Sequence, residues 1–286
     1  MSAFQPENLG LTSVGLPLLR DLIHERTGLF FDNGRYETLF DRVAPLVIGR
    51  GLRSFLDFYY LLKYNDGSAA DEWRNVMDAL AVHETYFWRE IDQIHALAAR
   101  VMPELARHAS GRPVRIWSVP CATGEEPLTI AMVLQEAGWF DRVPIEIHAS
   151  DGSAAAIRRA KAGVYRERAF RTLPPAMREK YFTPAGDAWK PCPELSARIA
   201  SWSVVNLMHD RETALLATSP AIFCRNAFIY FSPESVKHVA DHFADRLPTP
   251  GYLFVGASES LLRVTDRYVL QEIDGAFVYV KRVRSA

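Results

Sequence analysis

Apolar residues near the start of the chain recur every three or four positions, from Leu16 to about Leu62. This spacing is typical of amphipathic helices. The next run, "NDGSAADEWRNVMDALAVHE", predicts a polar turn and one further amphipathic helix. We therefore expect a small all-α N-terminal domain over residues 1–78 and a linker over residues 79–90, with the hinge near residues 79–83.

Beyond residue 90, short apolar runs alternate with helical patterns. The strand candidates are "VRIWSV", "IEIHAS", "AIFCRN", "GYLFVGA" and "AFVYVKR", with helical segments such as "PLTIAMVLQEAG" between them. This alternation predicts an α/β domain over residues 91–286, with a mostly parallel sheet covered on both faces. Residues 183–204 interrupt the alternation with proline and turn residues, which predicts a small antiparallel β insertion at the edge of the sheet.

Composition narrows the possible partners. The chain has 286 residues, 49% hydrophobic content and a formal net charge of -1, so we expect a globular protein with no global attraction to nucleic acid. Neither a membrane-spanning stretch nor a signal pattern is evident, which favours a cytoplasmic protein without membrane insertion. The three cysteines have no disulfide or metal-ligand spacing, so we expect reduced core thiols and no metal site.

The run "VRIWSV" leads directly into the turn "PCATGEEP". In open α/β sheets, ligands bind beyond the carboxyl ends of the strands. Gly124 would let the backbone approach a ligand, and the next helix would point N–H groups at it. The fingerprint G-x-G-x-x-G is absent, and Glu125 and Glu126 place negative charge where a phosphate would lie. The turn therefore favours a ligand with positive charge.

The second predicted strand ends at Asp151. A carboxylate at this position can accept hydrogen bonds from both ribose hydroxyls. A nucleoside with a cationic group and no phosphate corresponds to S-adenosylmethionine. An alternative of equal weight is purely structural: Glu125 and Glu126 favour the helix dipole, and Asp151 caps a helix.

Four ordered motifs strengthen the first interpretation: "HETYFWR", "RIWSVPCATGEEPLTIAM", "AIFCRNAFIYF" and "LFVGASESL". Together they closely resemble the CheR family of chemotaxis methyltransferases. The resemblance implies a Rossmann-like S-adenosylmethionine-dependent domain and a protein-glutamate O-methyltransferase that esterifies glutamates on the cytoplasmic helices of chemoreceptors, with S-adenosylhomocysteine as product. The family's cofactor contacts fall on His83, Thr85, Arg89, Glu126, Asp151, Asn206, Leu207, Arg225 and Asn226.

The chain departs from the common family pattern at several positions. His83 stands where the family usually has Asn, Pro120 replaces a small residue, and "ASDGS" replaces the usual "DID". The inserted segment 183–204 looks slightly shorter than in relatives that dock on a receptor's C-terminal tether peptide. The resemblance therefore favours a tether-independent type.

Arg89 and Tyr230 are our candidates for steering the substrate carboxylate, since a guanidinium and a phenol can both hydrogen-bond it. Tyr230 could equally be a core aromatic. Four arginines in the stretch 34–55 could dock an acidic receptor helix. Taken alone, these arginines would be interpreted as ordinary solvated charges. The family resemblance favours a role in docking. They are Arg35, Arg42, Arg50 and Arg53.

Two other functions stay open at this point. A methyltransferase of the same fold could modify another acidic protein or a small carboxylic acid. A non-catalytic module could bind the cofactor and signal through protein contacts, although the retained Arg89, Asp151, Asn226 and Tyr230 argue against it.

Overall fold

The computed structural model describes residues 15–64 and 69–283, which form two compact units. The smaller, helical unit runs to Val82 and includes the segment Tyr230–Ser232. The larger, α/β unit contains His83–Ile229 and the chain from Pro233 onward. The predicted polar turn at residues 65–68 and the N-terminal run 1–14 lie outside the described residues.

Apolar stripes of four helices form the core of the helical unit, with side chains such as Leu19, Ile23, Val43 and Phe58 completely buried. The first helix ends at Thr27; the capping residue Gly28 has a left-handed φ of 77° and donates its N–H to the His24 carbonyl, as is common at helix C-termini. The helices of this unit are α1 (Leu16–Thr27), η3 (Asn33–Arg35), α2 (Tyr36–Gly49), α3 (Phe55–Tyr64) and α4 (Ala69–Leu80).

The segment Tyr230–Ser232 belongs to the helical unit because its backbone and side chains bond to it. Phe30 N donates to the Tyr230 carbonyl at 2.8 Å, and Leu29 forms an antiparallel bridge with Phe231. His24 Nε2 lies 2.9 Å from Ser232 Oγ. The backbone of Tyr230, a predicted catalytic residue, is therefore held by the loop that follows α1.

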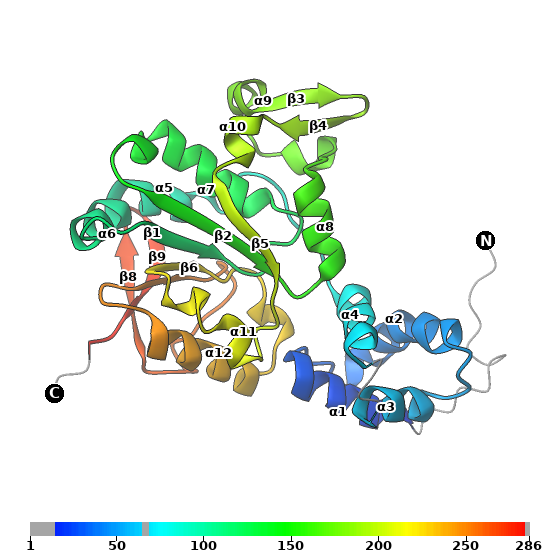
Figure 1. The fold of residues 1–286 in the computed structure, drawn as a ribbon. Coiled ribbons are helices and arrows are strands. Elements are labelled where there is room, and N and C mark those ends of the chain that lie inside the picture. Colours follow the sequence, from blue (N-terminus) through cyan, green and yellow to red (C-terminus); the bar gives the residue numbers. More distant parts are fainter. Residues whose placement is uncertain (1–14, 65–68, 284–286) are drawn as a thin grey trace. The chain divides into compact units, whose positions relative to one another are not determined.

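The core of the α/β unit is a seven-stranded sheet in the order β5-β2-β1-β6-β7-β9-β8 (Figure 1). The pairs from β5 to β7 are parallel, and β9 pairs antiparallel with both β7 and β8. This confirms the predicted α/β fold. The strands are β1 (Val114–Ser118), β2 (Ile145–Asp151), β5 (Ile199–Val204), β6 (Ala221–Phe223), β7 (Tyr252–Phe254), β8 (Tyr268–Ile273) and β9 (Ala276–Lys281).

Helices cover both faces of this sheet. Neighbouring residues of a strand point to opposite faces. Ile116 of β1 lies in the core cluster that contains Ile130 of helix α7, whereas Trp117 packs edge-on against Phe243 of helix α12. The longer helices are α5 (Ile91–Ala96), which continues through the π-helical turn η4 (Leu97–Val101) into α6 (Met102–His108), and α7 (Glu125–Glu136), α8 (Ala154–Ala162), α9 (Pro175–Tyr181) and α12 (Pro233–Arg246). The short helices are η5 (Trp139–Asp141), η6 (Glu167–Phe170), α10 (Pro193–Ser196), α11 (Asp210–Thr213), η7 (Leu216–Thr218) and η8 (Phe228–Tyr230), whose last residue belongs to the helical unit.

An antiparallel pair of strands, β3 (Phe182–Ala185) and β4 (Ala188–Pro191), forms the small insertion, separate from the main sheet (Figure 1). Residues 199–204, which the sequence placed inside the insertion 183–204, instead form β5 of the main sheet. There Trp202 pairs with Ala149 of β2. The difference arises because β5 is an edge strand whose partly exposed residues lack the continuous apolar run of the central strands.

Part of the segment 79–90, which the sequence predicted to be a linker, is packed within the α/β unit. Phe87 is completely buried and contacts the rings of Tyr165, Phe170 and Phe182, with ring centroids 4.8–5.1 Å apart. This burial makes residues from His83 onward part of the α/β unit.

Candidate functional site

Three neighbouring parallel strands end at one edge of the main sheet, and the loop after β1 is bonded to both of its neighbours. Cys121 N donates to the Ser150 carbonyl of β2, and Val119 N donates to the Phe223 carbonyl of β6, each at 2.8 Å. Backbone hydrogen bonds therefore link the loop after β1 to the ends of β2 and β6, where the other candidate residues lie.

Asp151, at the end of β2, joins this loop to its own strand. One carboxylate oxygen accepts the N–H of Ala122 at 2.9 Å, and the other accepts that of Ser153 at 2.8 Å. The N-cap of α8 is Ser153, whose Oγ accepts the N–H of Ala156, so Asp151 is not the helix cap. Each carboxylate oxygen has two lone pairs, so these bonds are compatible with a further ligand hydroxyl.

Gly124 has a left-handed φ of 98°. A Cβ at this position would lie 2.9 Å from the ring of Trp202, 2.9 Å from the Tyr165 hydroxyl and 3.2 Å from Ala160. The need for glycine therefore comes from close packing of the loop against β5, α8 and Tyr165. This reason differs from the close approach to a ligand that the sequence suggested.

Glu125 begins α7 and is buried, with 4% of its surface exposed. The Thr123 hydroxyl oxygen lies 2.9 and 2.7 Å from its two carboxylate oxygens. Burial raises the pKa of Glu125 to about 6, although the Thr123 hydrogen bond opposes the shift. The loop thus holds a carboxylate whose charge is poorly compensated.

Glu126 faces Arg225, so two of the predicted cofactor residues are in direct contact. Arg225 Nε lies 3.0 Å from one Glu126 oxygen, and Ser118 Oγ donates to the other at 2.6 Å. Burial raises the pKa of Glu126, and the charge of Arg225 opposes this. Arg225 also donates to the carbonyls of Arg89 at 2.6 Å and Glu90 at 3.2 Å, which connects β6 to the segment that precedes α5.

Asn226 follows Arg225 and has a left-handed φ of 57°. Its backbone N–H donates to Glu259 at 2.8 Å, and its side-chain Nδ2 donates to Glu90 at 3.1 Å. Neither Glu90 nor Glu259 was among the candidates from the sequence. The sequence contained one signal, because Glu90 directly follows the motif "HETYFWR" and Glu259 lies within "LFVGASESL".

Asn206 and Leu207 follow β5, next to β2. Val205 N donates to the Asp151 carbonyl at 3.0 Å, which places this loop beside the end of β2. The Asn206 backbone N–H donates to Glu212 at 2.9 Å, and its side-chain oxygen accepts the N–H of Met208 at 3.0 Å. The loop therefore has a defined shape at the same edge of the sheet.

The remaining candidates of the α/β unit are His83, Thr85 and Arg89, all partly buried. Arg89 Nη1 donates to the Glu84 carbonyl at 2.7 Å, and its guanidinium lies 5.6 Å from the centre of the Tyr86 ring. The side chain of Arg89 is 24% exposed, which leaves it accessible to a substrate group.

Two of the four predicted docking arginines have partners within the helical unit. Arg42 donates to the carbonyls of Leu80, at 2.8 Å, and Ala81 at the end of α4. Arg50 forms an ion pair with Glu72, which is 1% exposed. Arg35 and Arg53 have exposed side chains, so they are the better candidates for docking a partner.

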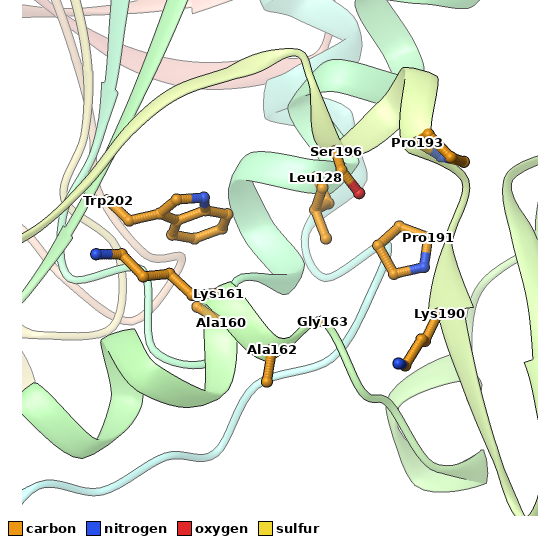
Figure 2. A pocket seen from close by; sticks show the side chains of 10 residues that line it. All are labelled: Leu128, Ala160, Lys161, Ala162, Gly163, Lys190, Pro191, Pro193, Ser196 and Trp202. Carbon is orange, nitrogen blue, oxygen red and sulfur yellow. The ribbon is translucent and has the colours of Figure 1, made fainter.

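A pocket of about 250 Å³ lies beside the glycine loop, since Trp202 and Ala160, which face position 124, also line it. Figure 2 shows its two lysines on opposite sides. None of the predicted cofactor contacts, all of which are described residues, lines this pocket. Its lining residues are Leu128, Ala160, Lys161, Ala162, Gly163, Lys190, Pro191, Pro193, Ser196 and Trp202. Within residues 15–64 and 69–283, every helix is too short or too polar to cross a bilayer.

Comparison with known proteins covers nearly the whole chain. Residues 83–276 match the family model "CheR methyltransferase, SAM binding domain", and residues 15–81 match "CheR methyltransferase, all-alpha domain". "Chemotaxis protein methyltransferase 2" of Vibrio cholerae serotype O1 is 31% identical over 273 residues, covering 95% of this chain and 94% of that protein. "Chemotaxis protein methyltransferase" of Vibrio parahaemolyticus is 33% identical, with coverage of 90% and 93%. "Chemotaxis protein methyltransferase 1" of Pseudomonas aeruginosa is 28% identical, with coverage of 92% and 96%.

Proposed function

Because this chain belongs to the CheR methyltransferase family and has that family's S-adenosylmethionine-binding domain, we propose that it methylates glutamate side chains on the cytoplasmic helices of chemoreceptors. S-adenosylmethionine supplies the methyl group, and S-adenosylhomocysteine is the product. The observation that carries the proposal is the contact network at the ends of β1, β2 and β6, which joins Glu126 to Arg225 and Asp151 to the loop after β1.

The chemistry of these residues fits a cationic nucleoside. Glu125, Glu126 and Asp151 are carboxylates at one edge of the sheet, and the turn carries one glycine in place of a phosphate-binding fingerprint. Asp151 would hold the ribose, and Asn206 and Leu207, after the adjacent strand, would contact the base. Glu126, Arg225 and Asn226 would hold the opposite end, together with His83, Thr85 and Arg89.

The reaction requires little acid or base catalysis from the chain. A glutamate with an ordinary pKa of about 4.3 is ionised near neutral pH and is itself the nucleophile. The residues therefore need to align the two reactants and exclude water, an effect that reaches roughly 7–11 kcal/mol in favourable systems. We assign the orientation of the substrate carboxylate to Arg89.

Arg35 and Arg53 are proposed to dock the receptor helix, since methylated helices carry clustered glutamates that attract basic side chains. Arg42 and Arg50 have structural partners and contribute less to docking. We further propose that docking does not need a receptor tether. The receptor helices lie in the cytoplasm, so we place the enzyme there as well.

A methyl-transfer assay tests the function. The purified protein would be incubated with methyl-labelled S-adenosylmethionine and a receptor cytoplasmic fragment without its C-terminal tether, and the esters mapped by mass spectrometry. We expect glutamate methyl esters that release methanol in alkali. Transfer only to free carboxylic acids or to another acidic protein would contradict the proposed substrate. Retention of the cofactor without any transfer would indicate a signalling module instead.

The Arg89→Ala variant tests the assignment of the substrate carboxylate. Loss of a charge-assisted hydrogen bond costs about 1.5–3 kcal/mol, so single-turnover transfer at saturating cofactor should fall by about 10- to 100-fold. The exposed Arg112→Ala variant is the matched control and should retain its rate. An unchanged rate for Arg89→Ala would remove Arg89 from the reaction.

A further inference from the structure

Three segments that are distant in the sequence meet at Asn226. They are the end of β6, the segment Gly256–Glu259 after β7, and Glu90 before α5. Asn226 and Glu90 both have left-handed backbones, with φ of 57° and 47°. Strained non-glycine residues of this kind persist only where their surroundings hold them, and they cluster at functional sites.

Glu259 holds the backbone of Asn226. Its Oε2 accepts the N–H of Asn226 at 2.8 Å and that of Gly256 at 2.6 Å, and its Oε1 accepts the N–H of Ile229 at 3.2 Å. A Cβ at position 256 would lie 2.5 Å from Asn226 Nδ2 and 2.9 Å from Glu259 Oε2. Glycine at 256 is therefore required for these groups to approach one another.

Glu90 holds the side chain of the same residue. One carboxylate oxygen accepts Asn226 Nδ2 at 3.1 Å, and the other accepts the N–H of Ala257 at 3.1 Å. Because a carboxylate only accepts hydrogen bonds, the amide nitrogen of Asn226 must face Glu90. The carboxamide oxygen is then oriented as the acceptor for other groups.

We propose that Glu90 and Glu259 are positioning residues that act on the bound methyl donor through Asn226: Glu259 fixes its left-handed backbone, and Glu90 fixes the direction of its carboxamide. This inference rests on the proposed placement of Asn226 in the cofactor site. Glu90 and Glu259 themselves need not touch the cofactor.

A double-mutant cycle tests this inference, with affinity for S-adenosylhomocysteine measured by calorimetry. Glu259→Gln keeps the shape, but its amide nitrogen cannot accept, so the N–H groups on one side, either Asn226 and Gly256 or Ile229, lose their acceptor. We expect Asn226→Ala and Glu259→Gln each to weaken affinity by about tenfold, the equivalent of one hydrogen bond. The double variant should be no weaker than Asn226→Ala alone, because coupled residues are not additive. Glu90→Gln should behave in the same way.

The exposed Glu272→Gln variant is the control and should bind like the wild type. Additive losses in the cycle would overturn the inference, because a general loss of stability would weaken binding independently of Asn226. Weaker binding by Asn226→Ala with unchanged binding by both glutamate variants would also overturn it, while leaving the proposed function intact. Failure of the wild type to bind S-adenosylhomocysteine would instead contradict the proposed function. If Glu259→Gln does not fold, the double-mutant cycle of Asn226→Ala with Glu90→Gln tests the inference in its place.

Discussion

Replacing Glu125 by Gln should stabilise the α/β unit at neutral pH, because the wild-type carboxylate is buried where its charge is disfavoured. The pKa of Glu125 rises from an ordinary value of 4.5 to about 6 on folding. The folded state therefore binds this proton more tightly than the unfolded state. Stability from the protonated form is fully present below pH 4.5 and is lost as the pH rises through 6.

The size of the effect follows from the shift. One pKa unit corresponds to about 1.36 kcal/mol, so a shift from 4.5 to about 6 costs the ionised protein about 2 kcal/mol. Glu125 is 4% exposed, so solvent screens this cost little. The same linkage gives about 0.8 kcal/mol at pH 5, where most of the folded protein carries the proton on Glu125. The stabilisation by Glu125→Gln should therefore grow between pH 5 and pH 7 and then level off.

Urea unfolding followed by tryptophan fluorescence measures this difference. Among the six tryptophans, Trp73 belongs to the helical unit and the other five to the α/β unit, so the signal mainly reports the latter. The exposed Glu272→Gln variant, on β8, should change nothing at either pH. A Glu125→Gln protein that is less stable than the wild type at pH 7, or a difference that does not shrink toward pH 5, would refute the reasoning from burial.

Three further outcomes are expected. Asp151→Ala should weaken binding of S-adenosylhomocysteine by about 1–3 kcal/mol, and unchanged affinity in calorimetry would contradict the ribose assignment. The pair Arg35→Glu and Arg53→Glu should raise the Michaelis constant for a receptor fragment and reduce its dependence on salt, because these attractions are screened over about 8 Å at physiological ionic strength. Arg50→Met should destabilise the helical unit by about 2–3 kcal/mol, below the range for a fully buried pair because Arg50 is half exposed. Replacing Glu72 by Met as well should restore most of that stability, as measured by thermal unfolding.

The period of the apolar positions predicted most of the fold. The central strands β1, β6 and β7 are almost completely buried, and β2 is buried over its last three residues. Buried strands read as continuous apolar runs. The outer strands β5 and β8 did not stand out, because their burial is partial. Residues 199–204 were therefore assigned to the insertion, and β8 was not predicted.

The positions of some candidate site residues followed from the predicted topology, while their roles stay predictions. Acidic residues at strand ends and after the first turn mark a ligand edge in an α/β sheet, which led to Glu126 and Asp151. The roles of Glu90 and Glu259 were not predictable, because their partners are backbone N–H groups and one amide that folding brings together. The partners of Arg42 and Arg50 could not be predicted either, because folding brings them together from distant parts of the sequence.

Backbone strain connects these findings. Six described non-glycine residues have positive φ, and four of them lie in the segments around the site: Trp88, Glu90, Ala122 and Asn226. Each left-handed residue costs roughly 1–2 kcal/mol.

Each of the four peptide groups bonds to a side chain from another segment. Asp151 accepts Ala122 N, Glu259 accepts Asn226 N, Arg225 donates to the Glu90 carbonyl, and Thr129 Oγ1 accepts Trp88 N. Three of these side chains, Asp151, Glu259 and Arg225, are charged. Hydrogen bonds to charged groups contribute about 1.5–3 kcal/mol, which is enough to offset the strain at the residues they hold. Neutralising one of these charges should therefore change the shape of its loop before it unfolds the α/β unit, so ligand affinity should respond more strongly than the melting temperature.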